Sequence, residues 1–278
     1  MSKMHNIVVD VRPEVDFIQG HCLSSVHIDG IAALSERQYE LPEPQQAMTV
    51  IYNPEQEAVL RAWLMTKGYQ QVTFQPWSLS FKQQLIEQKA LKTGVSIAYA
   101  WRPSPVVQAF VDGVSLPDEL ALRQGLDLAC GAGRDLVYLA MQGWQMTGVD
   151  LREEMLEKAQ ALAKRQQVHI TTEQRDCESS ADPFEHCADE SYGLINVARY
   201  LHRPLFPVLK RLLAPKGYVV YHTFMQGCEA FGSPKNPRFL LAPNELAGLF
   251  SDYQIVQNSL ITLADGRPMC CFIARKPG

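Results

Sequence analysis

Hydrophobic positions in the longer, C-terminal part of the chain alternate between short apolar runs and segments with helical spacing. Short runs of four to eight apolar residues are typical of buried strands, and apolar residues three or four positions apart are typical of helices. The pattern predicts helices over 103–112, 134–142, 152–166, 204–213 and 243–250, and strands over 125–129, 145–149, 168–174, 192–197, 217–224, 253–261 and 268–274. Repeated strand–helix units predict a mostly parallel, doubly wound, Rossmann-like α/β sheet of seven strands.

The first part of the chain predicts a smaller α/β unit. Strand patterns cover 6–11, 48–52 and 70–74, and an amphipathic helix is expected over 54–68. Residues 78–94 are polar and helical in composition, which is typical of a linker or a bridging helix. We therefore expect one domain over 1–80, a linker over 81–94 and a second domain over 95–278.

Composition, charge and cysteine spacing argue against several classes of function. The 278 residues carry a formal net charge of −4, so no general excess of positive charge attracts nucleic acid. No apolar run approaches the roughly 18 residues of a membrane span, and we expect a cytoplasmic protein. The seven cysteines form no Cys-x-x-Cys pair, and Cys177 with "EHC" at 185–187 lacks a second ligand pair. Reduced thiols and no metal site are the expectation.

A glycine turn interrupts the apolar pattern in "LDLACGAGRD", residues 126–135. Gly131 and Gly133 stand between a predicted buried strand and a predicted helix, where a ligand can approach the backbone and helix N–H groups. A dinucleotide-binding fingerprint needs a third glycine at position 136, which is Leu136 here. The turn therefore argues against a nicotinamide-dependent oxidoreductase.

Three acidic residues occur at the ends of successive predicted strands. Asp127 is expected to be buried and then needs donors or a cation, Asp150 could accept both hydroxyls of a ribose, and Asp176 could accept from an adenine amine. S-adenosylmethionine offers an ammonium group, a sulfonium and a ribose diol, and it has no phosphate. The alternative is that each aspartate only caps the helix that follows it. Three together favour the cofactor.

"LDLACGAGRD" with "GVD" at 148–150 resembles motif I and the acidic second strand of class I S-adenosylmethionine-dependent methyltransferases. The segment "INVARYLHRPLFPVLKRLLAPKGYVVYHTF", residues 195–224, is similar to a later section of that family. The resemblance covers about 95–278 and is nearest to bacterial tellurite-resistance methyltransferases. It implies that the cofactor is held at the methionine end by Asp127, Gly131 and Gly133, at the ribose by Asp150, at the adenine by Asp176 and the Cys177 backbone, and beside the sulfonium by Asn196 and Val197, with Cys130 and Leu151 completing the set.

The stretch "VDVRPEVDFIQGHCLSSVHI", residues 9–28, resembles the opening of a rhodanese-like domain. That family places its catalytic cysteine directly after the strand that corresponds to 48–52, and this chain has Asn53 there, followed by "PEQEA". Without a thiolate no persulfide can form, which argues against a sulfurtransferase. The module is expected to be non-catalytic and to bind a protein partner, to self-associate or to brace the enzyme.

Candidates for the chemistry follow the fourth and fifth strands. Tyr200, His202 and His222 are candidate bases, although each could equally be a hydrogen-bonded wall residue. Arg102, Arg199 and Arg238 are candidates for binding a small anionic acceptor, and the Gly- and Pro-rich loop 225–243 predicts a lid.

The leading hypothesis is a methyltransferase acting on a small molecule, with a chalcogen oxyanion or a thiol as the suggested acceptor. The alternative is an S-adenosylmethionine-binding regulatory or scaffold protein whose N-terminal module recruits a partner.

Overall fold

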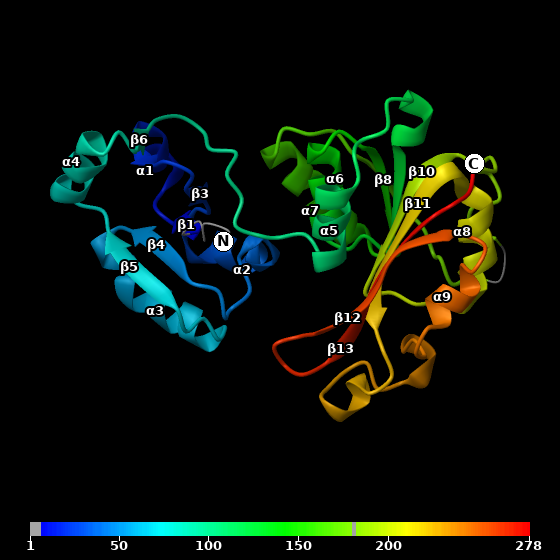
Figure 1. Cartoon of the computed structure of the whole chain (residues 1–278). Coiled ribbons are helices and arrows are strands. Elements are labelled where there is room, and N and C mark those ends of the chain that lie inside the picture. The colour runs from blue at the N-terminus through cyan, green and yellow to red at the C-terminus, as the bar shows by residue number, and fades with distance from the viewer. Residues whose placement is uncertain (1–6, 180–181) are drawn as a thin grey trace. The chain divides into compact units, whose positions relative to one another are not determined.

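The computed structural model describes residues 7–179 and 182–278. The chain divides into two compact units, Met1–Arg102 and Pro103–Gly278, each with its own sheet. Both units combine helices with parallel strands (Figure 1), as the apolar pattern predicts.

The first unit is built on a four-stranded parallel sheet with the order β3-β1-β4-β5. Its strands are β1 (Ile7–Asp10), β3 (Val26–His27), β4 (Met48–Tyr52) and β5 (Val72–Pro76). Its helices are α1 (Glu14–Gln19), α2 (Gly30–Glu36), α3 (Glu57–Thr66) and α4 (Leu79–Glu87). Apolar residues such as Val9, Val50 and Leu60 form a core of their own for this unit.

The segment expected as a linker, 81–94, lies inside the first unit. A short strand β6 (Leu91–Lys92) pairs antiparallel with β2 (His21–Cys22), and Leu85 of α4 is buried. The boundary between the units instead falls between Arg102 and Pro103. The difference has a physical reason, because a single buried leucine and a two-residue pairing anchor this segment without a long apolar pattern.

The second unit has a seven-stranded sheet with the order β12-β13-β11-β10-β7-β8-β9. The five strands from β11 to β9 run parallel, and β13 and β12 are antiparallel to their neighbours. The strands are β7 (Gln124–Leu128), β8 (Gln145–Asp150), β9 (Thr171–Gln174), β10 (Tyr192–Ala198), β11 (Leu213–Phe224), β12 (Gln254–Thr262) and β13 (Pro268–Arg275).

Helices cover both faces of this second sheet (Figure 1). On one side lie α5 (Pro105–Gly113), α6 (Arg134–Met141) and α7 (Glu153–Arg165), and on the other lie α8 (Phe206–Leu212) and α9 (Glu245–Leu249). Leu209 and Phe250 pack with Val197, Tyr221 and Phe272 in a buried cluster beneath α8 and α9. This burial supplies the main apolar driving force for the layer.

The two glycines of the turn between β7 and α6 have different surroundings. Both are left-handed, with φ of 54° at Gly131 and 79° at Gly133. A Cβ at Gly133 would lie 2.6 Å from the Cβ of Ala159 on α7, whereas a Cβ at Gly131 would meet nothing within 4 Å. Close packing of α6 on α7 therefore requires Gly133, while Gly131 borders open space.

We predict that Gly133→Ala lowers the free energy of unfolding by about 2–4 kcal/mol, because it adds a steric clash to the strain of a left-handed alanine. Gly131→Ala should lose only the strain, about 1–2 kcal/mol. Urea unfolding of the two variants measures the difference, and equal losses would contradict the packing role of Gly133.

Candidate functional site

The carboxyl ends of parallel strands bring the predicted site residues to one edge of the second sheet. Asp127 of β7 is in register with Asn196 of β10, and Asp150 is the last residue of β8. Asp176 follows the end of β9 by two residues. In sheets of this kind, ligands bind outside the carboxyl ends of the strands where the connections diverge to opposite faces. The sequence-predicted residues of β7, β8 and β10 share such an edge.

The glycine turn is held to the end of β8 by two hydrogen bonds. The Cys130 N–H donates to the Val149 carbonyl at 2.9 Å, and the Gly131 N–H donates to Asp150 Oδ2 at 2.9 Å. The Cys130 thiol is largely enclosed, and burial, followed by the charges of Asp127 and Asp150, raises its pKa. A neutral thiol in these surroundings is typical of a packing residue and not of a nucleophile.

Asp127 is the most deeply buried acid of the site, with 2% of its surface exposed. The Asn196 Nδ2 donates to its Oδ1 at 2.7 Å. Burial, followed by the charge of Asp135, raises the pKa of Asp127 well above its usual 3.8, although the bonds from Asn196 and the Leu136 backbone oppose the shift. The carboxyl group therefore lacks a positive partner that would stabilise its ionised form.

The amide of Asn196 has one further unsatisfied atom. Its Oδ1 is buried and accepts no hydrogen bond from any residue within 7–179 and 182–278. The hydroxyl of Ser104, whose backbone N–H donates to Asp135 Oδ1 at 2.6 Å, is likewise buried without a partner among the described residues. Buried acceptors without donors cost free energy, so a ligand that brings N–H groups or positive charge fits these residues. The ammonium group of S-adenosylmethionine has both properties.

Asp150 and Asp176 each accept a bond from the N–H two residues further on, but neither caps a helix, because the residue that precedes α7 is Arg152 and residues 177–179 are not helical. Asp150 accepts from Gly131 through one oxygen and from the Arg152 N–H through the other, at 3.0 Å. Asp176 accepts from the Glu178 N–H at 2.8 Å and is exposed. A carboxylate oxygen can accept more than one hydrogen bond, so these contacts leave capacity for ribose or adenine donors.

The other predicted cofactor residues differ in their exposure. Leu151 is 59% exposed beside Asp150, which makes its side chain available for apolar contact with a ligand. The Cys177 side chain is buried, and burial raises the pKa of its thiol to about 11. Val197 is wholly buried in the cluster beneath α8 and α9, so only its backbone is open to the proposed role beside a sulfonium.

His222 is buried at the end of β11. Its Nδ1 lies 3.0 Å from the Cys270 carbonyl, an acceptor, which makes Nδ1 the protonated nitrogen and leaves the lone pair on Nε2. Burial lowers the pKa of this imidazole, against smaller raising effects of the Cys270 bond and the Asp135 charge. The side chain is therefore neutral near pH 7 and carries one basic nitrogen.

Tyr200 and His202 follow β10 and face a residue that the sequence analysis missed. The His202 Nδ1 lies 3.9 Å from Glu178 Oε2. Burial, followed by the charge of Glu178, raises the pKa of Tyr200, so its hydroxyl stays protonated. Glu178 lies two residues after Asp176, at the same strand end. This position alone does not distinguish it in the sequence from an ordinary exposed glutamate.

The three predicted arginines do not converge in one described site. Arg199 is exposed, has a left-handed φ of 56°, and donates its N–H to the His222 carbonyl at 2.6 Å. Arg238 is exposed in the loop that follows β11. Arg102 is exposed and is the last residue of the first unit, so nothing places it beside the sheet edge of the second.

The predicted lid, 225–243, has a fixed base. Met225 forms a bridge with Leu241, and the Gln226 N–H donates to the Leu241 carbonyl at 3.0 Å. Arg203 binds Glu245 through Nε at 2.7 Å and donates to the carbonyls of Arg238 and Leu240. These bonds hold the returning half of the loop, whereas residues 229–239 are mostly exposed. Closure over a ligand stays a prediction.

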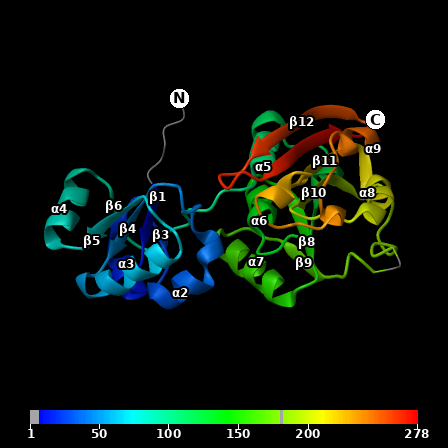
Figure 2. The ribbon, with the colours of Figure 1, turned by 90° about the horizontal axis from the view of Figure 1, so that it is seen from below.

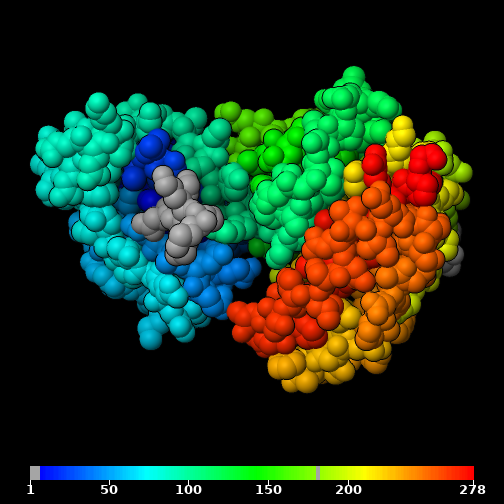
Figure 3. All heavy atoms as spheres, viewed as in Figure 1, coloured from blue at the N-terminus to red at the C-terminus, as the bar shows by residue number. Residues whose placement is uncertain are grey.

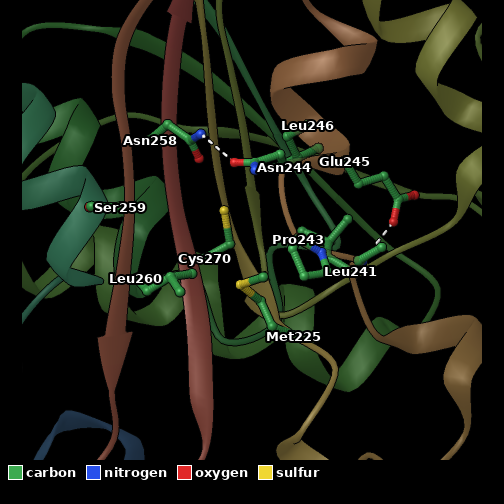
Figure 4. A pocket seen from close by; sticks show the side chains of 11 residues that line it. Met225, Leu241, Pro243, Asn244, Glu245, Leu246, Asn258, Ser259, Leu260 and Cys270 are labelled. Atoms are coloured by element: carbon green, nitrogen blue, oxygen red, sulfur yellow. Dashed lines mark hydrogen bonds between the residues drawn. The ribbon is translucent and has the colours of Figure 1, made fainter.

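A separate pocket of about 200 Å³ lies between residues 241–246 and the strands β12 and β13 (Figure 4). Its wall is mostly apolar, and the Asn258 Nδ2 reaches the Asn244 Oδ1 across it at 3.4 Å. None of the predicted cofactor residues lines it. The pocket is therefore distinct from the strand-end site.

In the first unit, the turn after β4 is closed by side-chain amides. The Asn53 N–H donates to Gln56 Oε1 at 3.0 Å, and the Asn53 Nδ2 donates to Asp16 Oδ2 at 3.2 Å. A buried ion pair between Arg12 and Asp10, at 2.7 Å, fixes the start of the loop that follows β1. The amide side chain of Asn53 is thus held in place at the end of β4.

Two classes of site find no support in the described parts of the chain. Within 7–179 and 182–278, no group of three His, Cys, Asp or Glu side chains could hold a metal ion. No described helix is long and apolar enough to cross a membrane.

Several solved structures are similar to this chain, all at low sequence identity. TehB from Haemophilus influenzae is 22% identical, with 62% of this chain and 61% of that chain covered and a TM-score of 0.47. An S-adenosylmethionine-dependent methyltransferase from Mesorhizobium loti is 19% identical, with 60% and 100% covered and a TM-score of 0.45. A third from Methanosarcina mazei is 18% identical, with 55% and 92% covered and a TM-score of 0.44. At TM-scores of this size we draw no argument from them.

The assignment rests on sequence comparisons. Residues 126–217 match a family described as a methyltransferase domain. A protein of Geobacillus sp. (strain WCH70) that carries the name of a methyltransferase is 54% identical over 52 residues, which are 17% of this chain and 21% of that protein. The match thus spans about a fifth of the relative's length. Residues 126–217, within the second unit of this chain, therefore match a methyltransferase domain.

Proposed function

We propose that the whole protein is an S-adenosylmethionine-dependent methyltransferase whose acceptor is a small molecule, with chalcogen oxyanions and thiols as the first candidates. The observation that carries this proposal is the Asp127–Asn196 pair, which combines a buried acid with an unsatisfied amide oxygen beside the glycine turn. When bound, the cofactor supplies an activated methyl group, and the residues of the chain supply binding and alignment.

Each part of the strand-end edge has one proposed task in binding. Asp127 and Asn196 receive the ammonium end, beside the open side of Gly131. Asp150 accepts the ribose hydroxyls, with Leu151 packing beside it. Asp176 and the Cys177 backbone bind the adenine. The existing bonds from Gly131 and Arg152 to Asp150 support this arrangement, because they fix the carboxylate before a ligand arrives.

His222 is the strongest candidate for the base. Its protonated Nδ1 is bound to a carbonyl, so a neutral imidazole with a free Nε2 is held in one orientation. Tyr200 and His202, with Glu178, form a second candidate group on the neighbouring strand end. An acceptor that is already an anion needs alignment and exclusion of water more than a base.

The positions of Arg199 and Arg238 support an anionic acceptor. Arg238 stands exposed on the loop 225–243, and Arg199 follows β10 at the same sheet edge as Asn196. We propose that Arg199 and Arg238 bind the acceptor when the loop closes. Arg102 remains a third candidate.

We also propose that the first unit is a rhodanese-like module without sulfur-transfer activity. The closed amide turn at Asn53 supports this proposal. The alternative function is a scaffold that binds the cofactor and recruits a partner. A broad screen for methyl transfer separates the two functions.

Asp150→Ala should weaken S-adenosylmethionine binding by about 2–4 kcal/mol, since it removes a charged acceptor of two ribose hydroxyls. Isothermal titration calorimetry measures this loss, with NAD as the comparison ligand for the wild-type protein. Saturable NAD binding without any response to S-adenosylmethionine would refute the assignment of the strand-end edge.

Asp127 should make cofactor binding depend on pH. Because its pKa is raised in the free protein, the acid holds a proton that a bound ammonium group displaces. Affinity should therefore rise with pH over the range in which Asp127 of the free protein loses its proton, by up to about tenfold per unit below the raised pKa, while the cofactor's amino group stays protonated. Asp127→Asn should remove this slope.

The same raised pKa of Asp127 lowers the free energy of unfolding of the free protein as pH rises above the unfolded value of 3.8. Asp127→Asn should lack this loss of stability.

Transfer to an anionic acceptor should depend on Arg238. With radiolabelled S-adenosylmethionine and a panel of thiols, selenite, tellurite and small carboxylates, Arg238→Ala should raise KM for the acceptor about tenfold and leave cofactor affinity unchanged. Lys164→Ala, an exposed cation near the end of α7, serves as the charge-matched control. An unchanged KM would exclude Arg238 from the acceptor site, and no transfer to any acceptor would favour the scaffold function.

A further inference from the structure

The two edges of the second sheet are protected to different degrees. β9 is four residues long and contains Glu173, whose carboxylate pairs with Arg175. β12 is nine residues long, "QIVQNSLIT", and contains neither a charged residue nor a proline. Figure 2 shows these two strands at opposite margins of the sheet. Protein sheets usually protect an edge by short length, charge, proline or a bulge, and of these β12 has only the bulge between Ile255 and Gln257.

The outer side of β12 is open within the second unit. No other strand among the described residues pairs with it except β13. Its apolar side chains Ile255, Val256 and Leu260 are 43%, 50% and 63% exposed. The residues around 254–262 form an orange band on the surface seen in Figure 3. A single bulge, between Ile255 and Gln257, leaves 257–262 in regular register with β13.

The register shows which backbone groups point outward. The Leu263 N–H donates to the Arg267 carbonyl, and hydrogen-bonded pairs alternate with non-bonded pairs along an antiparallel ladder. The next pair, Thr262 with Pro268, is then non-bonded, which agrees with the missing N–H of proline. By the same alternation Leu260 and Asn258 also direct their N–H and C=O groups away from β13.

We infer that β12 pairs antiparallel with β12 of a second copy of this chain, which joins the two sheets across a twofold axis. An antiparallel edge is self-complementary, because the outward N–H and C=O groups of one copy meet those of the other. Charge decides in favour of this edge: self-pairing places residues of the same strand near each other, and β12 has no charge to repel its copy. At β9 the same arrangement would bring two Glu173 side chains together.

Dimer formation also buries apolar surface that is exposed to solvent in the single chain. Ile255, Val256 and Leu260 lie on the strand that pairs, so their exposed surface decreases in the dimer. The paired strand alone is a small interface, and we therefore expect a dimer whose population depends on protein concentration. The inference uses none of the residues proposed for cofactor or acceptor binding.

The test is sedimentation equilibrium of the full chain over a range of concentrations. The fitted mass should approach twice 31.3 kDa as concentration rises. Leu260→Lys, which brings two like charges into the paired edges, should raise the dissociation constant at least about tenfold. Leu260→Pro, which removes an outward N–H, should do the same without adding charge. The control is Thr171→Lys, which adds the same charge to the β9 edge and should leave the mass unchanged.

Hydrogen exchange identifies the surface directly and does not depend on the variants. The amides of Asn258 and Leu260 should exchange more slowly at high than at low protein concentration, while circular dichroism verifies that each variant is folded. A wild-type chain that stays at 31.3 kDa at every concentration overturns the inference. So does a dimer that neither substitution at Leu260 weakens, because another surface then holds it.

Discussion

A buried acid of the second unit, Asp127, has no positive partner among the residues that the structure describes. Asp127 lies at the carboxyl edge of the central strands, with one amide donor from Asn196 and with Asp135 nearby. A buried carboxyl group of this kind is destabilising in its ionised form unless a cation meets it. The glycine turn, the open side of Gly131 and the unsatisfied oxygen of Asn196 then have a common explanation, which is a cationic ligand at this edge.

The two glycines of the turn, Gly131 and Gly133, have different roles. Gly133 lets the start of α6 approach Ala159 on α7. Gly131 does not serve that packing, and its N–H instead fixes Asp150. Asp150 accepts from Gly131 and Arg152 without capping α7, and its oxygens can still accept further hydrogen bonds.

Much of the sheet could be predicted from the sequence because apolar runs mark buried parallel strands. The glycine turn and the three strand-end acids were visible for the same reason, since their spacing follows the strand–helix repeat. The residues 81–94 could not be placed, because a two-residue pairing with β2 and one buried leucine leave almost no pattern. Glu178 and the pairing of Arg203 with Glu245 depend on contacts between distant segments, which no local pattern encodes. The roles proposed for the individual site residues remain predictions.

The central claim is that the acid at the strand edge exchanges its proton for the cation of the ligand. Calorimetry of S-adenosylmethionine binding over a series of pH values above 3.8, repeated in buffers of different ionisation enthalpy, measures the number of protons that binding releases. We predict proton release by the wild-type protein that diminishes as pH rises, and close to none at any pH by Asp127→Asn. Equal release by both proteins, or binding by the wild type without any proton release, would contradict it.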